Sequence, residues 1–201
     1  MKLKYGYFGF VLFLAITCGS GNETDQSIEE LTFVVNDSLL GPAFTDSTLL
    51  FTFHPPIGCE RVPDSTMLRV KDKIFDMMAQ QEGIEVIPVG FFINRESGSA
   101  CCLSRLSGME ANSRIFDTFR EYKSLLKDKF PDARIDEGAF RVNDINVFQY
   151  LISNNERVIF KLLCYSPKGR TFQLDYIVPR SMYHQHVKAI ESSIGSFKML
   201  P

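Results

Sequence analysis

The chain has 201 residues, of which 45% are hydrophobic and 23% charged, a composition typical of a globular protein with one sizeable core. The formal net charge is -2, whereas proteins that bind nucleic acids usually carry a basic excess, so we expect no nucleic-acid partner. Trp is absent, but eighteen Phe and seven Tyr supply large apolar side chains for the core.

The amino terminus has the layout of a signal peptide. Lys2 and Lys4 form a short positive start, and an apolar run without charged residues leads from there to Cys18. This run is about a dozen residues long, whereas a helix needs about 20 to span a bilayer, so cleavage is favoured over a permanent transmembrane segment. We predict a signal peptide over residues 1–17 and a polar tether over residues 18–30.

Cys18 follows the apolar run directly, and the segment Leu14-Ala15-Ile16-Thr17-Cys18 resembles the lipobox of bacterial lipoproteins. The resemblance implies cleavage before Cys18 and acylation of its thiol, for example with palmitate, which anchors the protein in a membrane of the cell envelope. Acyl chains contribute about 0.8 kcal/mol per buried CH₂, so a multiply acylated cysteine holds a soluble domain firmly. No Asp follows Cys18 directly, which points to the outer membrane, facing the periplasm. A secreted protein without an anchor is the alternative.

A single domain is predicted over residues 31–201. Two short β-favouring runs open it, at Leu31–Val35 and Leu49–Phe53. After Pro63, polar residues that can cap a helix precede apolar residues at helical spacing, and this helix should end near Gly83.

The middle of the chain predicts a hairpin and a second helix. The β-rich run Ile84–Asn94 is followed by a Ser-Gly turn signal, so Ala100–Leu106 is expected to pair back on it. Asn112 or Ser113 then begins a helix that Pro131 ends.

Three further strands are predicted at Ile145–Ile152, Val158–Tyr165 and Phe172–Val178, joined by short turn-forming connectors into an antiparallel meander. The first two are apolar on both faces and should lie centrally in the sheet. The third alternates apolar residues with polar ones, including Gln173 and Asp175, which places it nearer an edge.

A last helix is predicted to begin near Ser181 and to end close to Gly195. Helices packed on a mostly antiparallel sheet make the fold class α+β. We find no internal repeat and no inner linker.

Two segments resemble the Mog1/PsbP-like group. The first is the aromatic strand and proline turn Phe51-Thr52-Phe53-His54-Pro55-Pro56, and the second is Phe172-Gln173-Leu174-Asp175-Tyr176 leading into the helix at 189–197. The resemblance covers about residues 45–198. It implies an α/β/α sandwich and a binding or assembly role rather than catalysis.

Residues able to carry chemistry are few. His184 and His186 are two residues apart in a predicted helix and point about 200° apart, so they do not converge on one ion; His54 is the remaining histidine. We therefore predict no metal site and no cofactor. No nucleophile signature and no phosphate-cradling Gly-rich loop is present, so we predict no catalytic residues and no enzyme activity.

With Cys18 acylated, four cysteines remain, an even number in an oxidising compartment: Cys59, Cys101, Cys102 and Cys164. Cys101 and Cys102 are adjacent in a strand and should point to opposite faces. Buried free thiols are one interpretation. The other is a disulfide from Cys59 to Cys101 or Cys102, and Cys59–Cys101 is the pair that we predict.

The leading hypothesis is a lipid-anchored envelope protein with a non-enzymatic role, whose partners are the membrane, through the anchor, and an envelope protein or small ligand. The alternative is an envelope hydrolase or redox protein with an unrecognised site, which predicts a pocket where a titratable pair converges. A purely structural lipoprotein is a third hypothesis and predicts a large apolar surface patch.

Overall fold

The structure is a computed structural model that describes residues 28–67, 85–107 and 115–201, with side chains from residue 122 onward in the helix that begins at Ile115. The predicted signal peptide and its boundary at Cys18 lie outside these residues, as does most of the helix predicted between Pro63 and Gly83, of which only the first turn is described.

Eight strands form the main sheet, in the order β1-β7-β8-β9-β10-β6-β5-β4. Their bounds are β1 (Glu29–Glu30), β4 (Glu60–Arg61), β5 (Glu85–Asn94), β6 (Ser99–Ser107), β7 (Arg134–Val142), β8 (Ile145–Ser153), β9 (Arg157–Tyr165) and β10 (Thr171–Pro179). Every neighbouring pair is antiparallel except β1 and β7, which run parallel. The fold is therefore α+β with a dominant sheet.

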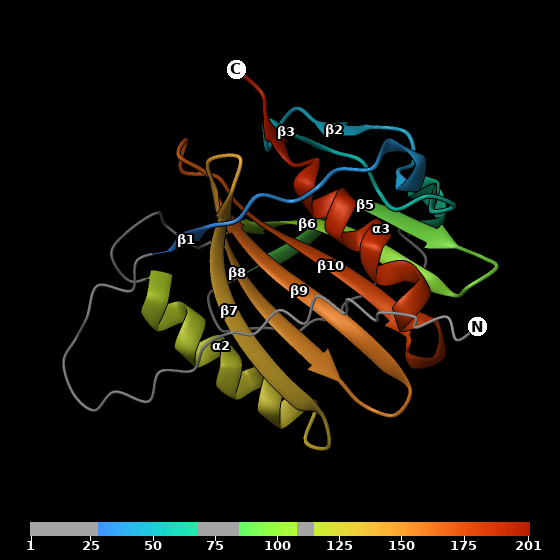
Figure 1. Ribbon diagram of the computed structural model, residues 1–201. Helices are drawn as coiled ribbons and strands as arrows, with labels where there is room; N and C mark the ends of the chain where they lie inside the picture. The colour runs from blue at the N-terminus through green and yellow to red at the C-terminus, as the bar shows by residue number, and fades with distance from the viewer. Residues whose placement is uncertain (1–27, 68–84, 108–114) are drawn as a thin grey trace, which may run out of the picture.

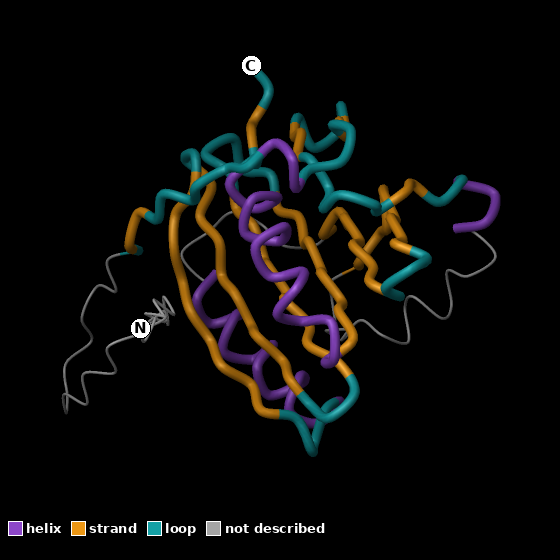
Figure 2. Tube along the Cα trace, turned by 45° about the vertical axis from the view of Figure 1, so that its right-hand side comes forward, coloured by secondary structure: helices purple, strands orange, loops and turns teal. Residues whose placement is uncertain are grey.

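A second, three-stranded sheet has the order β11-β3-β2, formed by β11 (Lys198–Met199), β3 (Phe51–Phe53) and β2 (Phe44–Asp46). The helices are α2 (Ile115–Lys129) and α3 (Tyr183–Gly195), with short 3-10 turns η1 (Asp37–Leu39) and η2 (Arg180–Met182). Across the main sheet, α2 lies on one face and α3 on the other, as Figures 1 and 2 show.

The period-two alternation of strand side chains divides the interior into two cores, one on each face of the main sheet. The core under α3 and the small sheet includes Phe51, Phe53, Leu162, Leu174, Ile190, Ile194 and Phe197. The core under α2 includes Phe91, Leu106, Tyr122, Leu126, Phe148, Ile152 and Leu163. Because both faces are covered, the central strands are buried along nearly their whole length.

Most predicted elements are confirmed. The predicted hairpin corresponds to β5 and β6, the meander to β8, β9 and β10, and the last helix to α3. The short strands β1, β2, β4 and β11 were not predicted, and neither was the long strand β7. The side chains of β7 are mostly exposed or half-buried, with Gly138 in the middle, and therefore lack the apolar pattern of a strand. Leu31–Val35 was predicted as a strand but is not one, because the pairing of Glu29–Glu30 with β7 ends at Glu30.

The prediction that β10 lies near an edge is wrong. The strand lies between β9 and β6, and Gln173 and Asp175 are buried rather than facing solvent. The alternation of polar and apolar residues was real, but the polar side faces α2 and is satisfied there by internal partners, described below.

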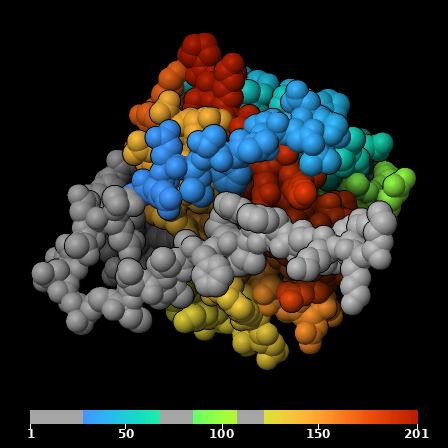
Figure 3. All heavy atoms as spheres, in the orientation of Figure 1, coloured from blue at the N-terminus to red at the C-terminus, as the bar shows by residue number. Residues whose placement is uncertain are grey.

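The segment Leu31–Asn36, here called the strap, crosses α3 on the outside of the molecule, and Figure 3 shows it in blue over the red helix. The Leu31 backbone N–H donates to the Arg141 carbonyl at 2.9 Å, and the Asn36 N–H donates to Ser192 Oγ at 3.3 Å. At Gly195 the approach is so close that a Cβ would lie 2.8 Å from Phe33 Cβ. The described residues begin at 28, inside the predicted tether of residues 18–30.

Candidate functional site

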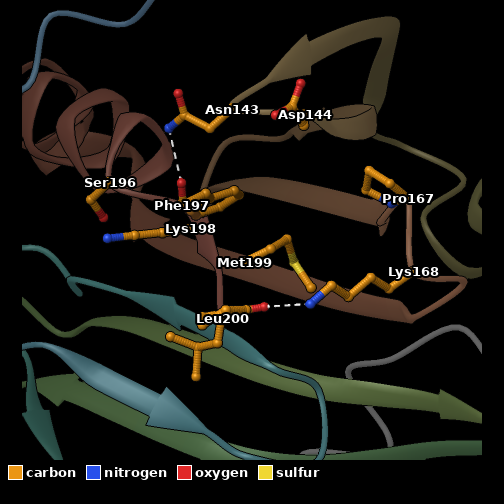
Figure 4. A pocket seen from close by; sticks show the side chains of 10 residues that line it. Asn143, Asp144, Pro167, Lys168, Ser196, Phe197, Lys198, Met199 and Leu200 are labelled. Atoms are coloured by element: carbon orange, nitrogen blue, oxygen red, sulfur yellow. Dashed lines mark hydrogen bonds between the residues drawn. The ribbon is translucent and has the colours of Figure 1, made fainter.

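A hollow of about 640 Å³ lies where the end of the chain passes two hairpin turns (Figure 4). We call it the C-terminal hollow. Its lining residues come from the β7–β8 turn, the β9–β10 turn and the last six residues: Asn143, Asp144, Pro167, Lys168, Ser196, Phe197, Lys198, Met199, Leu200 and Pro201. Its volume falls within the usual range for ligand pockets, roughly 300–1,000 Å³.

The β7–β8 turn forms one wall. Asn143 and Asp144 have positive φ angles of 47° and 66°, as a two-residue hairpin turn of type I′ requires, and Asn and Asp tolerate this conformation better than other side chains. The Asn143 amide Nδ2 donates to the carbonyls of Gly195 at 3.0 Å and Phe197 at 2.9 Å. These two bonds fix the turn against the end of α3.

The last residues of the chain form the floor. In β11, Lys198 pairs with Thr52 and Met199 with Phe51, and the Leu200 N–H donates to the Leu50 carbonyl at 2.7 Å. The Lys168 ammonium reaches across from the β9–β10 turn and donates to the Leu200 carbonyl at 2.9 Å. The floor is therefore held from both sides.

The lining combines apolar surface with charge. Phe197 is buried, with its ring centroid 5.3 Å from that of Phe51, while Lys168 and Lys198 supply two cations and Asp144 one carboxylate. A ligand that combines apolar groups with a negative charge would find complements here, whereas the lining holds no cysteine or histidine to serve as nucleophile or base. The arrangement suits binding.

A second polar group lies deep in the core under α2. We call it the buried polar cluster, and it consists of Lys161, Asp175, Gln173 and Tyr122. The Lys161 ammonium donates to Asp175 Oδ1 at 2.8 Å, and these side chains are only 2% and 4% exposed. Gln173 Nε2 donates to Asp175 Oδ2 at 2.6 Å, and the Tyr122 hydroxyl donates to Gln173 Oε1 at 3.2 Å. The cluster thus links α2 to the two central strands β9 and β10.

The cluster is organised for packing rather than for proton transfer. Burial alone would lower the pKa of Lys161, but the Asp175 carboxylate beside it, helped by Tyr122, outweighs burial and raises the pKa above its ordinary value. A lysine that acts as nucleophile or base needs the opposite shift. Lys161 therefore stays charged at neutral pH, and its role is to neutralise Asp175.

The four described cysteines are buried free thiols. Cys101 packs in the core under α3 and Cys102 in the core under α2, which confirms that they point to opposite faces. Burial raises the pKa of Cys59 to about 11, against the effect of a hydrogen bond from the Asn94 backbone, and that of Cys102 to about 12. Reactive thiols have lowered pKa values, so these thiols are not activated.

The predicted Cys59–Cys101 disulfide is not formed in the structure. The strand register explains the separation, because Cys59 directly precedes β4 and the whole of β5 lies between β4 and β6, which carries Cys101. Two strand spacings amount to about 10 Å, whereas the Cα atoms of a disulfide are usually 4.4–6.8 Å apart.

The three histidines lie in different surroundings. His184 and His186 lie in α3 as predicted, and the His54 ring Nδ1 is 2.9 Å from the Gly41 carbonyl. Among the residues that the structure describes, no group of three or more His, Cys, Asp or Glu side chains could hold a metal ion.

None of the histidines and cysteines considered from the sequence as candidates for chemistry lines the C-terminal hollow. The Asn143-Asp144 dipeptide before the β-favouring run at Ile145 was the one available signal, since Asn and Asp favour hairpin turns. The hollow itself depends on β11 and on long-range hydrogen bonds such as that from Lys168 to Leu200. No local sequence pattern predicts these contacts. Across the described residues, neither helix has the length and apolarity needed to cross a bilayer.

No protein-family model and no curated protein matches the chain. Among solved structures, the chain is similar to the cyanobacterial PsbP protein (CyanoP) of Synechocystis, with 14% identity and a TM-score of 0.48. The match covers 79% of this chain and 91% of that chain. At this identity and TM-score the similarity decides neither the family nor the function.

Proposed function

We propose that this protein is a lipid-anchored component of a bacterial cell envelope with a non-enzymatic binding or assembly role. The observation that carries the proposal is the order of segments at the amino terminus: a short positive start, an apolar run too short to span a bilayer, and Cys18 followed by polar residues. In this role the anchor supplies the membrane attachment, and the folded domain supplies the binding surface.

The chemistry of the domain supports binding rather than catalysis. Its buried lysine is held as a neutralised ion pair, its buried thiols have raised pKa values, and its hollow is lined by apolar side chains and charges. We therefore assign the binding role to the C-terminal hollow. We also propose that the domain belongs to the Mog1/PsbP-like group, on the strength of its order of elements and of its aromatic strand before the Pro55-Pro56 turn.

Metabolic labelling with a palmitate analogue tests the anchor. The native chain and a Cys59→Ala variant should both be labelled and recovered with membranes, because Cys59 is buried in the folded domain. A Cys18→Ala variant should lose the label. Equal labelling of the native and Cys18→Ala chains would remove the anchor from the proposal.

A further inference from the structure

One edge of the small sheet faces the C-terminal hollow. Pairs in an antiparallel ladder alternate between hydrogen-bonded and non-hydrogen-bonded, and the bond from Leu200 N–H to Leu50 puts Leu200 in a bonded pair. The pair formed by Met199 and Phe51 is then the non-bonded one. The backbone N–H and C=O of Met199 accordingly point away from β3.

The side away from β3 is the side of the hollow. The Phe197 carbonyl, two residues before Met199 and therefore on the same edge, accepts from the side chain of Asn143, which lines the hollow. Figure 4 shows Asn143 bonded to Phe197 at one end of residues 197–200 and Lys168 bonded to Leu200 at the other end. In the described part of the chain, no partner bonds to the Met199 backbone groups.

We propose that the C-terminal hollow binds an extended peptide segment of a partner protein, which adds as a strand to the free edge of β11 and presents acidic side chains to Lys168 and Lys198. Strand addition supplies main-chain hydrogen bonds to Met199, and alternate side chains of the peptide then face the hollow. The proposal rests on the binding role given above and is independent of the anchor.

The charges and the apolar lining define the chemistry of this partner. Lys168 uses one of its three N–H donors on the Leu200 carbonyl, which leaves two for an acidic side chain. Asp144, on the β7–β8 turn, would disfavour a second carboxylate at that wall. We therefore expect an acidic residue near the lysines, alternating with apolar residues that contact Met199 and Pro167.

An acidic partner segment fits this edge better than a second copy of the chain. Pairing of β11 with β11 of another molecule would bring Lys168 and Lys198 toward the same two lysines of that molecule, and like charges disfavour association. A peptide with carboxylates has the complementary charge.

The test uses the full chain in detergent micelles, with a phage-displayed library of random linear heptapeptides as the probe. Enriched peptides should alternate acidic and apolar residues. A synthetic copy of one should slow hydrogen exchange of the Met199 amide by at least about tenfold, measured by NMR. N-methylation of its backbone nitrogens on the edge facing β11 should abolish binding.

Lys168→Glu should weaken the peptide by about two- to fivefold, the range for an exposed ion pair. The matched control Lys127→Glu, exposed on α2, should leave binding unchanged. The proposal is overturned by a library that yields no enrichment, by binding that tolerates N-methylation, or by a dimer formed through β11. Each of these results leaves the labelling at Cys18 untouched, so failure of this inference is distinguishable from failure of the anchor.

Discussion

Lys161 is a charged side chain at the centre of a sheet that is covered on both faces. It is partnered by Asp175, directly opposite on β10, and removal of one member of such a pair leaves the other charge buried and unpaired. We predict that Lys161→Met lowers the free energy of unfolding by about 3–5 kcal/mol. Urea denaturation measures this change.

Two controls distinguish loss of the partner from loss of the side chain. Lys161→Met combined with Asp175→Leu should recover much of the stability, because no buried charge is left over. Lys127→Met, on the exposed side of α2, should change the free energy of unfolding by less than about 0.5 kcal/mol. If Lys161→Met alone were as mild as Lys127→Met, the pair would not stabilise the sheet.

The buried polar cluster also explains why β10 was wrongly predicted to lie near an edge of the sheet. Gln173 and Asp175 alternate with apolar residues, and without knowledge of their partners this alternation indicates a solvent-exposed face. Their partners are on other elements, Lys161 on β9 and Tyr122 on α2, so only the assembled fold shows that the face is buried. The apolar side of β10, which needs no specific partner, was predicted correctly.

Burial of Cys59 makes the free energy of unfolding depend on pH. Its pKa in the folded chain is about 11, against an ordinary value of 9.0, so between pH 9 and pH 11 the unfolded chain loses this proton while the folded chain keeps it. The stability that this thiol contributes is therefore fully present below pH 9 and is lost as pH rises toward pH 11. Cys59→Ala should make the fall in unfolding free energy between pH 9 and pH 11 shallower. Parallel curves for the two chains would contradict the assignment.

At the scale of elements, the strap is held against α3 by close packing at one glycine. A Cβ at Gly195 would lie 2.8 Å from Phe33 Cβ and 2.9 Å from Val35 Cγ2. We predict that Gly195→Ala displaces the strap and destabilises the fold by about 1–3 kcal/mol, the usual range for overpacking. The strap should also become easier to cleave by protease, since Val34 is already 88% exposed.

Gly138 provides the matched control. It lies in β7, and a Cβ there would meet nothing within 4 Å. Gly138→Ala should be neutral or slightly stabilising, because alanine loses less conformational entropy on folding. Equal destabilisation by both alanine substitutions would mean that contact with the strap is not the cause.

Elements with a clear apolar pattern in their own sequence were predictable, whereas elements that form by pairing with distant residues were not. Strands β8 and β9 and helix α3 have long apolar patterns with clear turn residues at their ends. Strand β11 has only two residues and forms by pairing with the edge of β3. The preceding residue, Phe197, packs on Phe51 of β3. The candidate site was missed for the same reason, since its lining combines two turns and a chain end.

At the scale of the whole molecule, the chain enters the fold at one edge of the main sheet. The strand β1 pairs with β7 at Phe140 and Arg141. Only nine residues, 19–27, lie between Cys18 and Ile28, the first described residue, so ten Cα–Cα steps join the two. A ten-residue segment spans at most about 36 Å. An anchored domain would therefore stay close to the membrane surface, where its partners would be found.

The intact mass of the purified protein is a direct test of cleavage and acylation at Cys18. We expect a chain that lacks residues 1–17, begins at Cys18, and carries the added mass of acyl chains on its first residue. Fragmentation should locate that mass on Cys18, and Cys59→Ala should leave it in place. A chain that retains residues 1–17, or that has an unmodified thiol at Cys18, would rule out the lipid anchor.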